Sequence, residues 1–374
     1  MPTFIPVNEP LLNGNEKKYL NECIDSGWIS SEGPFVGKLE TQFAERVSRE
    51  YGVAVCNGSA ALDIAVKALN IGKGDEVIFP TFTIISCAAA IVRSGAVPVL
   101  VDSDPITWNM DVNQIEAKIT PRTKAIMVVH IYGLPVDMDT VLMLAQKYNL
   151  RIIEDAAEMH GQYYKDKPCG SFGDISIFSF YPNKHVTTGE GGILVTNEEH
   201  LAARCRAFRD LCFIKERRFK HEELGWNNRM SNLQAAVGVA QLERLDEFIV
   251  LKREMGKLYT SILSGCNKIQ IPQPSMTYSE NIYWVFGLVL DENLGINAQL
   301  IMKELGDRGI GTRPFFYPMH LQPVFNKMGL FNGESYPVAE RIAEQGFYLP
   351  SGLTMNKEKI EICANTLLSV LSEK

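Results

Sequence analysis

The chain has 374 residues, of which 46% are hydrophobic and 22% charged, a balance typical of a globular protein with a substantial core. Basic residues number 37 and acidic residues 44, so the formal net charge is −7, which argues against a nucleic-acid partner. No apolar run approaches the ~20 residues that span a bilayer, and the first residues lack the basic and apolar regions of a secretory signal, so we expect no membrane partner.

Short β-branched runs alternate with helical patterns in the first part of the chain. Apolar strands separated by helices predict an α/β fold with a mainly parallel seven-stranded sheet, flanked by helices on both faces. The last two strands are separated by only about a dozen residues with no helical pattern, so we expect them to be antiparallel. The seven predicted strands are 53–56, 76–80, 97–102, 124–129, 151–155, 174–180 and 192–197.

The second part of the chain begins with helical patterns. A long helix is predicted from Ser231 onward, because apolar residues such as Leu233 and Val237 recur at helical spacing. Further elements follow a second helical stretch, and they predict a smaller C-terminal α+β domain. They are a strand at 283–290, a helix at 297–309, a strand at 310–314 and a helix at 356–371. We therefore expect a large domain with an N-terminal arm at 1–248 and a small domain at 249–374.

Residues able to hold a ligand follow three of the predicted strands. Asn57, Gly58 and Ser59 follow the first strand and open a helix, while Asp155 and Ser179 lie near the ends of two later strands. In open α/β sheets, ligands bind at the carboxyl ends of the strands. Backbone N–H groups and the helix dipole attract anions to a helix N-terminus, so this glycine and serine indicate a phosphate site. The alternative is that Ser59 only caps the helix.

Lys184 lies just beyond Ser179, before the glycine-rich sequence TGEGG. A free lysine has a pKa of ~10.4, so a neutral amine at pH 7 costs about 4–5 kcal/mol unless its site lowers that value. A Schiff base with a cofactor aldehyde avoids this cost. The alternatives are a solvated turn lysine and, for Asp155, a helix cap or surface charge. Together, the anion site, the acid and the lysine form the set that pyridoxal 5′-phosphate (PLP) requires.

Ordered motifs along nearly the whole chain carry a family resemblance. They are GWISSEGPFVGKLETQFA, CNGSAALDIA, GDEVIFPTFT, GAVPVLVD, ITPRTKAIMVVHIYG, IIEDAAE, GSFGDISIFSFYPNKHVTTGEGG, GWNNRMSNLQAAVGVAQLERLD and GTRPFFYPMH. By these motifs the chain resembles the DegT/DnrJ/EryC1/StrS family of PLP-dependent sugar-nucleotide aminotransferases. The resemblance implies fold type I of the PLP-dependent transferases, and the first part of the chain would be the PLP-binding domain.

The resemblance also implies roles for matching residues. Lys184 would be the Schiff-base lysine and general base, and Asp155 would bind the pyridine nitrogen. Glu158 would lie near the ring hydroxyl, and Ile84 would cover the ring where relatives usually have an aromatic residue. The other cofactor-binding candidates are Gly58, Ser59, Ala60 and Ser179 around the phosphate, and Asn227 at the phosphate bound by a neighbouring subunit. The substrate-binding candidates are Trp28, Ser30, Arg229, Arg313, Tyr317 and His320.

The sequence leaves alternative roles open for several basic residues. Arg229 and Arg313 could instead pair with acids of the sheet or helices. A basic and aromatic stretch could clamp a diphosphate or be a solvated loop; its cations are Arg209, Lys215, Arg217, Arg218 and Lys220. The eight cysteines include no CxxC pair, which favours free thiols in the cytoplasm over disulfides or a zinc site, and we expect no metal.

The implied activity is transfer of an amino group from glutamate to a nucleotide-linked 4-keto-6-deoxy sugar, for cell-surface polysaccharide biosynthesis, with pyridoxamine 5′-phosphate as the intermediate cofactor form. WISSEG, NKHVTTGEGG and TRPFFYPMH are most similar to members that aminate C4 of GDP-4-keto-6-deoxymannose. The nucleotide (GDP, dTDP or UDP) and the carbon (C3 or C4) are left open. A sugar dehydratase is disfavoured, because those relatives replace the lysine with histidine, and so is a non-enzymatic regulator. The role of Asn227 implies a homodimer with shared active sites.

Overall fold

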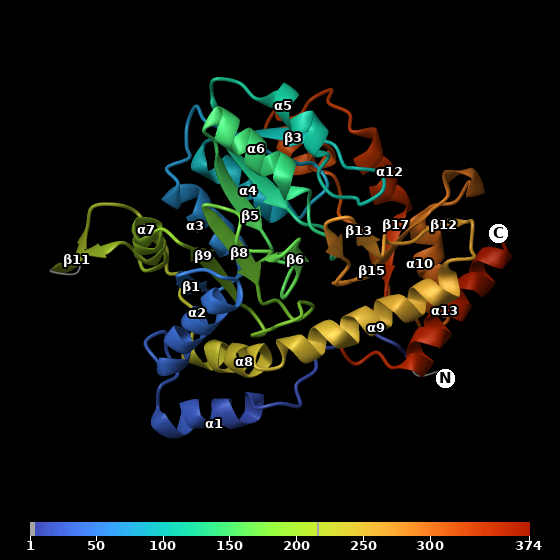
Figure 1. Cartoon of the computed structure of the whole chain (residues 1–374), viewed down its shortest axis with the longest axis horizontal. Helices are drawn as coiled ribbons and strands as arrows, with labels where there is room; N and C mark the ends of the chain where they lie inside the picture. Colours follow the sequence, from blue (N-terminus) through green and yellow to red (C-terminus); the bar gives the residue numbers. More distant parts are fainter. Residues whose placement is uncertain (1–3, 215–216) are drawn as a thin grey trace.

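The computed structural model describes residues 4–214 and 217–374. A seven-stranded sheet lies at its centre (Figure 1). Its strands are β1 (Tyr51–Val55), β2 (Glu76–Pro80), β3 (Val97–Val101), β4 (Thr123–Val129), β5 (Arg151–Asp155), β8 (Ile175–Ser179) and β9 (Gly192–Thr196). In the order β1-β9-β8-β5-β4-β2-β3, β9 runs opposite to the other six strands. The predicted mainly parallel sheet is confirmed, and so is the antiparallel pairing of its last two strands.

Alternate residues of these strands face two hydrophobic cores, because successive side chains of a strand point to opposite faces. In β1, Val53 and Val55 join one core, and Ala54 joins the other. Helices α3, α4 and α7 cover the first face, and α2, α6 and α8 cover the second. Their bounds are α2 (Pro34–Arg46), α3 (Gly58–Ala68), α4 (Ile85–Ser94), α6 (Met138–Tyr148), α7 (Glu199–Arg209) and α8 (Asn232–Leu242).

A second, four-stranded antiparallel sheet lies in the C-terminal part of the chain (Figure 1). Its strands, in spatial order, are β12 (Ile269–Gln270), β15 (Phe286–Leu290), β17 (Gly346–Leu349) and β16 (Arg313–Pro314). Helices α9, α10 and α13 enclose a third core against it. The helices of this part are α9 (Leu245–Leu263), α10 (Ala298–Asp307), α11 (Pro323–Lys327), α12 (Pro337–Gln345) and α13 (Lys357–Ser372).

The remaining elements are short, apart from α1 (Glu16–Ser26), which packs against α8. The short elements are α5 (Ile115–Lys118), β6 (Tyr163–Tyr164), β7 (Lys167–Pro168), β10 (Phe213–Ile214), β11 (Arg217–His221), β13 (Ser275–Met276), β14 (Ser279–Glu280), and the 3₁₀ turns η1 (Val112–Gln114), η2 (Glu292–Leu294) and η3 (Met319–Leu321). Within the described ranges, no helix has both the length and the apolar composition that crossing a bilayer requires.

The helix predicted from Ser231 is two helices. Ser231 caps α8 through a capping box with Gln234, and the helix ends at Leu242 before α9 begins. The expected domain boundary at 248/249 lies inside α9. Because α9 contributes Ile249 to the second core and Tyr259 to the third, one continuous helix contacts both parts of the chain.

The N-terminal segment also packs on the C-terminal part. The backbone N–H of Ile5 donates to Gly309 O at 2.9 Å, and its carbonyl accepts from Gly311 N at 2.8 Å. Ile5 itself is buried in the third core. We therefore propose a division in which α9 is shared between the two parts and the residues around Ile5 belong with the smaller one.

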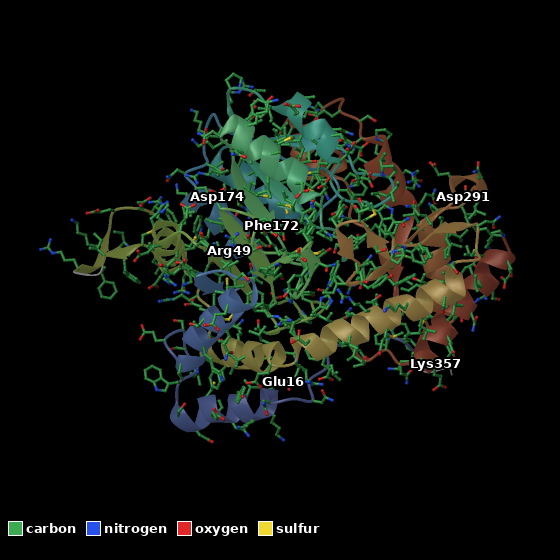
Figure 2. All side chains as sticks on the ribbon, in the orientation of Figure 1. Glu16, Arg49, Phe172, Asp174, Asp291 and Lys357 are labelled. Atoms are coloured by element: carbon green, nitrogen blue, oxygen red, sulfur yellow. The ribbon has the colours of Figure 1, made fainter. Side chains whose placement is uncertain are left out.

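A buried carboxylate, Glu154, holds the loop between β7 and β8. It lies on β5 beside Asp155 and is fully buried. Its oxygens accept hydrogen bonds from Gly170 N, Phe172 N, Gly173 N, Ser176 Oγ and His130 Nε2, at 2.5 to 3.2 Å. Arg49, labelled with Phe172 in Figure 2, donates to two carbonyls of the same loop.

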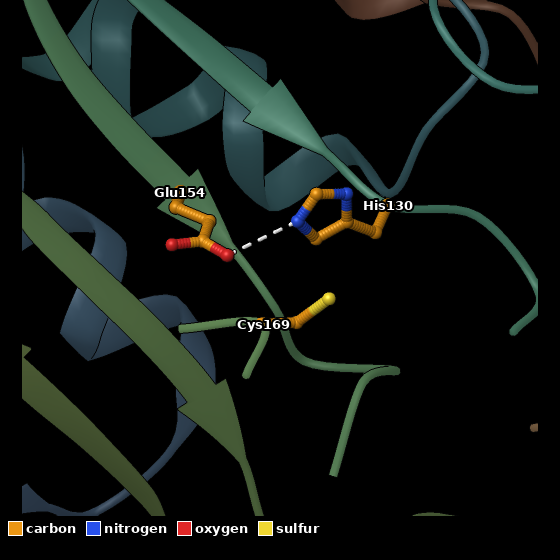
Figure 3. Close-up of side chains that lie close together, drawn as sticks. All are labelled: His130, Glu154 and Cys169. Atoms are coloured by element: carbon orange, nitrogen blue, oxygen red, sulfur yellow. Dashed lines mark hydrogen bonds and ion pairs between the residues drawn. The ribbon is translucent and has the colours of Figure 1, made fainter. Parts of the chain in front are cut away.

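His130, Glu154 and Cys169 lie close enough together to suggest a metal site (Figure 3). The donors around Glu154 already occupy its oxygens, and His130 Nδ1 accepts a hydrogen bond from Val136 N at 3.0 Å. Burial also raises the pKa of the Cys169 thiol well above its ordinary value, whereas a metal ligand would be the thiolate. Hydrogen bonds therefore satisfy this cluster, and we assign no metal to it.

We expect Glu154→Gln to make the protein less stable at neutral pH than at acidic pH, relative to the unsubstituted chain. Burial alone would raise the pKa of Glu154, but His130 and the loop N–H groups lower it to about 2. The folded-state pKa is therefore below the unfolded value of ~4.3, so ionised Glu154 contributes about 3 kcal/mol above that pH and loses it as the pH falls toward 2. Urea unfolding at pH 7, 5 and 3 measures the difference.

The control for this substitution is Glu116→Gln, which alters an exposed carboxylate paired with Lys147 and should leave the unfolding midpoint nearly unchanged. An equal loss of stability from Glu154→Gln at pH 7 and pH 3 would show that the carboxylate charge contributes nothing.

Candidate active site

A cavity of about 490 Å³ opens at the carboxyl ends of the parallel strands. Residues that follow β1, β2, β4, β5 and β8 meet there, as expected for an open α/β sheet. The C-terminal part of the chain closes its other side. The lining residues are Asn57, Gly58, Ser59, Leu62, Thr83, Ile84, Ser86, Val129, His130, Asp155, Ala157, Glu158, Ile177, Ser179, Tyr181, Asn183, Lys184, Glu190, Trp284, Arg313, Phe316 and Tyr348.

Lys184 lies in a tight turn after β8, where its backbone N–H donates to Tyr181 O at 2.9 Å. Its side chain is 11% exposed, and Nζ lies 3.6 Å from Glu158 Oε1. Burial lowers the pKa of the Lys184 amine, while the negative charges of Glu158 and Asp155 act in the opposite direction. The structure therefore excludes a solvated surface lysine here.

Asp155 ends β5 and is 3% exposed. Its Oδ1 accepts a hydrogen bond from Ala157 N at 3.0 Å, and its Oδ2 lies 3.3 Å from Cys87 Sγ. Burial raises the pKa of this carboxyl, and the contacts with Ala157 and Cys87 oppose the rise. A buried carboxylate with so few donors is suited to a cationic partner in the cavity.

Glu158 contacts both Lys184 and the loop that follows β4. Its Oε2 accepts a hydrogen bond from Tyr132 N at 2.8 Å. Burial raises the pKa of Glu158 to about 7, although Lys184 acts to lower it. At neutral pH this side chain can therefore either donate or accept a proton.

The N-terminus of α3 forms a polar pocket beside these groups. The helix is capped by Asn57, whose Oδ1 accepts from Ala60 N at 2.8 Å, so Ser59 is not the cap. Ser59 Oγ instead lies 2.7 Å from Ser86 Oγ. Gly58 allows the helix to approach β8 closely, because a Cβ there would lie 2.9 Å from the Cβ of Ser179.

These residues fit pyridoxal phosphate. The first backbone N–H groups of α3 have no partner within the helix, and together with the hydroxyls of Ser59 and Ser179 they suit a phosphate dianion. Asp155 suits a protonated pyridine nitrogen, and Lys184 suits the aldehyde. Ile84 also lines the cavity, and its side chain is exposed at the N-terminus of α4.

Two predicted site residues do not line the cavity, and hydrogen bonds within the chain occupy their polar groups. Ala60 is buried, and its N–H is bonded to Asn57. His320 is 2% exposed, with Nδ1 2.8 Å from Thr81 Oγ1 and Nε2 3.0 Å from Glu340 Oε1. Neither residue is available to a ligand in this arrangement.

The other predicted residues outside the cavity lie on the surface of the chain. Asn227 Oδ1 accepts from Arg229 Nε at 2.9 Å, and Arg229 Nη1 donates to Asp210 at 2.8 Å, so Arg229 does pair with an acid. The exposed residues among them are Trp28, Ser30, Asn227 and Tyr317. Arg313 does line the cavity, from β16.

The cations of the stretch that could clamp a diphosphate or be a solvated loop lie in different places. Arg209 lies apart from the rest, because its guanidinium pairs with Glu40 at 2.6 Å. Arg217 and Lys220 are exposed on the hairpin of β10 and β11, which extends away from the body of the chain at the left of Figure 1. Lys215 lies outside the described residues.

Several lining residues were not predicted. Ser86 could have been inferred from PTFTIISC, since a serine one position into a helix beside a phosphate site is a plausible donor. Trp284 and Tyr348 come from the C-terminal part of the chain, and nothing in their local sequence points to a cavity formed by the first part. Phe316 lies in the motif GTRPFFYPMH, between the predicted residues Arg313 and Tyr317.

Comparisons with known proteins identify the family of this chain. The DegT/DnrJ/EryC1/StrS aminotransferase family profile matches residues 10–368. The chain is 42% identical to a GDP-perosamine synthase of Escherichia coli O157:H7, covering 99% of this chain and all of that protein. It is 41% identical to a GDP-perosamine synthase of Caulobacter vibrioides, with 98% of each chain covered.

A solved structure, the aminotransferase from Psychrobacter cryohalolentis, superposes with a TM-score of 0.92 at 30% identity, with 99% of each chain covered. Profile, relatives and fold therefore agree over the whole length. The chain belongs to the DegT/DnrJ/EryC1/StrS aminotransferase family, and it is a PLP-dependent transaminase.

Proposed function

We propose that this enzyme transfers the amino group of glutamate to C4 of GDP-4-keto-6-deoxymannose, in the biosynthesis of a cell-surface polysaccharide. The observation that carries the proposal is the cavity in which Lys184, Asp155 and Glu158 converge beside the N-terminus of α3. The choice of sugar is supported by the whole-length similarity to proteins named GDP-perosamine synthase.

We propose the residue roles that the family resemblance implies, and the positions of these residues in the cavity support them. When bound, the cofactor supplies a ring that withdraws electrons from the carbon that loses a proton. Asp155 holds a proton on the ring nitrogen. Lys184 would take the proton from Cα of glutamate and hold it on Nζ for its return, and it would move a proton in the reverse direction for the sugar. Glu158 would lie near the ring hydroxyl, and Ile84 would cover the ring face, since both side chains line the cavity.

The remaining assignments concern anions and the assembly. Gly58, Ser59 and Ser179 hold the phosphate, and Arg313 faces the substrates from the cavity wall. We propose a homodimer with shared sites, in which Asn227 meets the phosphate bound by the neighbouring subunit; its position outside the cavity of its own chain is compatible with that role. The other proposed contacts with the sugar nucleotide are Trp28, Ser30, Arg229 and Tyr317. The eight free cysteines support a cytoplasmic location.

A panel of keto sugars tests the proposal. The purified protein is incubated with glutamate and GDP-, dTDP- or UDP-linked 4-keto-6-deoxy sugars, and products are identified by mass spectrometry and NMR. We expect a 4-amino product from the GDP sugar and 2-oxoglutarate in equal amount. Faster amination of a dTDP or UDP sugar would assign a different nucleotide, and a C3 product would assign a different carbon. No turnover of any sugar would overturn the proposal.

A further inference from the structure

Trp284 contacts the catalytic lysine from the C-terminal part of the chain. It lies just before β15, is 3% exposed and lines the cavity. Lys184 Nζ lies 3.8 Å from the centroid of its ring, the shortest cation–ring distance in the described part of the chain. The indole Nε1 also donates to Asn183 O at 2.7 Å. One side chain therefore fixes both the amine and the backbone next to it.

The Lys184 amine has an acidic neighbour as well. Glu158 Oε1 lies 3.6 Å from Nζ, so the amine contacts both a carboxylate and an aromatic face. A desolvated ring face attracts an ammonium more strongly than an exposed one does. Both contacts favour the protonated amine, whereas burial favours the neutral amine.

Lys252 fixes the backbone of Trp284. It lies on α9, is 2% exposed, and its Nζ donates to Trp284 O at 2.8 Å and to Ser351 O. No acid pairs with it within 4–214 and 217–374. Burial lowers the pKa of Lys252 to about 7, with a smaller contribution from the charge of Lys184. The helix that contacts both parts of the chain therefore anchors the residue that contacts the catalytic amine.

We propose that Trp284 is a positioning residue for Lys184, holding the amine against Glu158 and favouring its protonated form whenever the amine is not bonded to the cofactor. The inference rests on the proposed role of Lys184 as proton carrier. In that role the amine must be free while the cofactor carries the amino group, so its resting place sets its basicity and orientation.

Other ionisable groups surround Lys184, and the experiment has to separate their effects from that of Trp284. Burial lowers the pKa of the His160 and His185 imidazoles, which leaves both neutral. The charged groups that face the amine or line its cavity are Asp155, Glu158, Glu190, Lys252 and Arg313, with the hydroxyls of Tyr181 and Tyr348 on the same wall. Substituting Trp284 leaves all of these in place.

The test measures the titration of Lys184 itself. Full-length protein loaded with pyridoxamine phosphate is trace-labelled with acetic anhydride from pH 6 to 11, and acetylation of the Lys184 peptide is read by mass spectrometry. We expect Trp284→Leu to move the midpoint about one pH unit lower, because the charged amine loses its ring contact. Trp284→Phe keeps a ring face and should stay within about 0.3 of the unsubstituted protein.

Trp108→Leu is the matched control, because Trp108 is equally buried and also packs against Tyr132, yet does not line the cavity of Lys184. Its midpoint should not move. An unchanged midpoint in Trp284→Leu, or an equal change in Trp108→Leu, overturns the inference.

A second measurement covers the case in which Trp284→Leu does not fold. Tryptophan emission of the unsubstituted protein should titrate with the labelling midpoint, and that transition should be absent in Lys184→Met and in Trp284→Phe. Persistence of the transition in Trp284→Phe contradicts the inference. Both measurements are independent of any sugar, so a failure to aminate the GDP sugar would overturn the proposed function alone.

Discussion

Lys184→Ala is expected to lower the rate of amino transfer by about 10³- to 10⁴-fold. Among the described residues, the substitution removes the only amine that lies beside both Asp155 and Glu158. Positioned acid–base groups contribute about 10²–10⁴-fold to a rate. The variant also loses the covalent attachment of the cofactor. Single-turnover absorbance changes on mixing the PLP-loaded protein with glutamate measure the rate. Borohydride should attach the cofactor to the Lys184 peptide in the unsubstituted protein and should fail to do so in the variant.

Lys147→Ala is the control for this experiment. Lys147 is exposed on α6 and pairs with Glu116 at 2.6 Å, a contact of little energetic weight, so its removal should leave both the rate and the borohydride product unchanged. If Lys184→Ala kept more than about one tenth of the rate, another base would have to carry the proton, and the assignment of Lys184 would be wrong.

Asp155→Asn is expected to lower the same rate by about 10²- to 5 × 10³-fold and to weaken cofactor binding. The amide has the shape of the carboxylate, but it cannot balance a proton on the ring nitrogen. Breaking a buried charge pair costs about 3–5 kcal/mol, and each 1.36 kcal/mol is a factor of ten. Cofactor affinity is measured by absorbance titration of the apoprotein with pyridoxal phosphate, and the rate by the same single-turnover assay.

Asp63→Asn provides a matched control for the aspartate, since Asp63 on α3 pairs with Arg93 on α4, does not line the cavity and should affect neither quantity. Retention of the full rate by Asp155→Asn would mean that the ring works unprotonated in this enzyme, and the role assigned to the carboxylate would be lost.

The strands of the large sheet could be predicted closely from local sequence. The runs at 76–80 and 151–155 coincide with β2 and β5, because buried parallel strands are short, apolar and bounded by turn residues. Asp155 and Lys184 could be placed near one another for the same reason: parallel strands bring their carboxyl ends to one edge, whatever helices cover them.

Local patterns failed where a distant part of the chain decides the outcome. The helical periodicity after Ser231 continues across residues 243–244, so the break between α8 and α9 has no signal in the spacing of apolar residues. Histidine is a residue type common in active sites, yet both ring nitrogens of His320 are hydrogen-bonded to Thr81 and Glu340 from other elements. Tryptophan is a residue type common in protein cores, yet the ring of Trp284 contacts Lys184.

The sequence by itself determined the α/β class, the segments that form the strands of the central sheet, and the lysine, aspartate and helix N-terminus around which the cofactor fits. These depend on periodicity and on neighbours within a few positions, which a single chain displays directly. Only the tertiary structure decided which side chains close the cavity and what basicity they confer. Burial and the distances between charges arise when segments a hundred residues apart pack together, as Trp284 does on Lys184, and those quantities set a pKa.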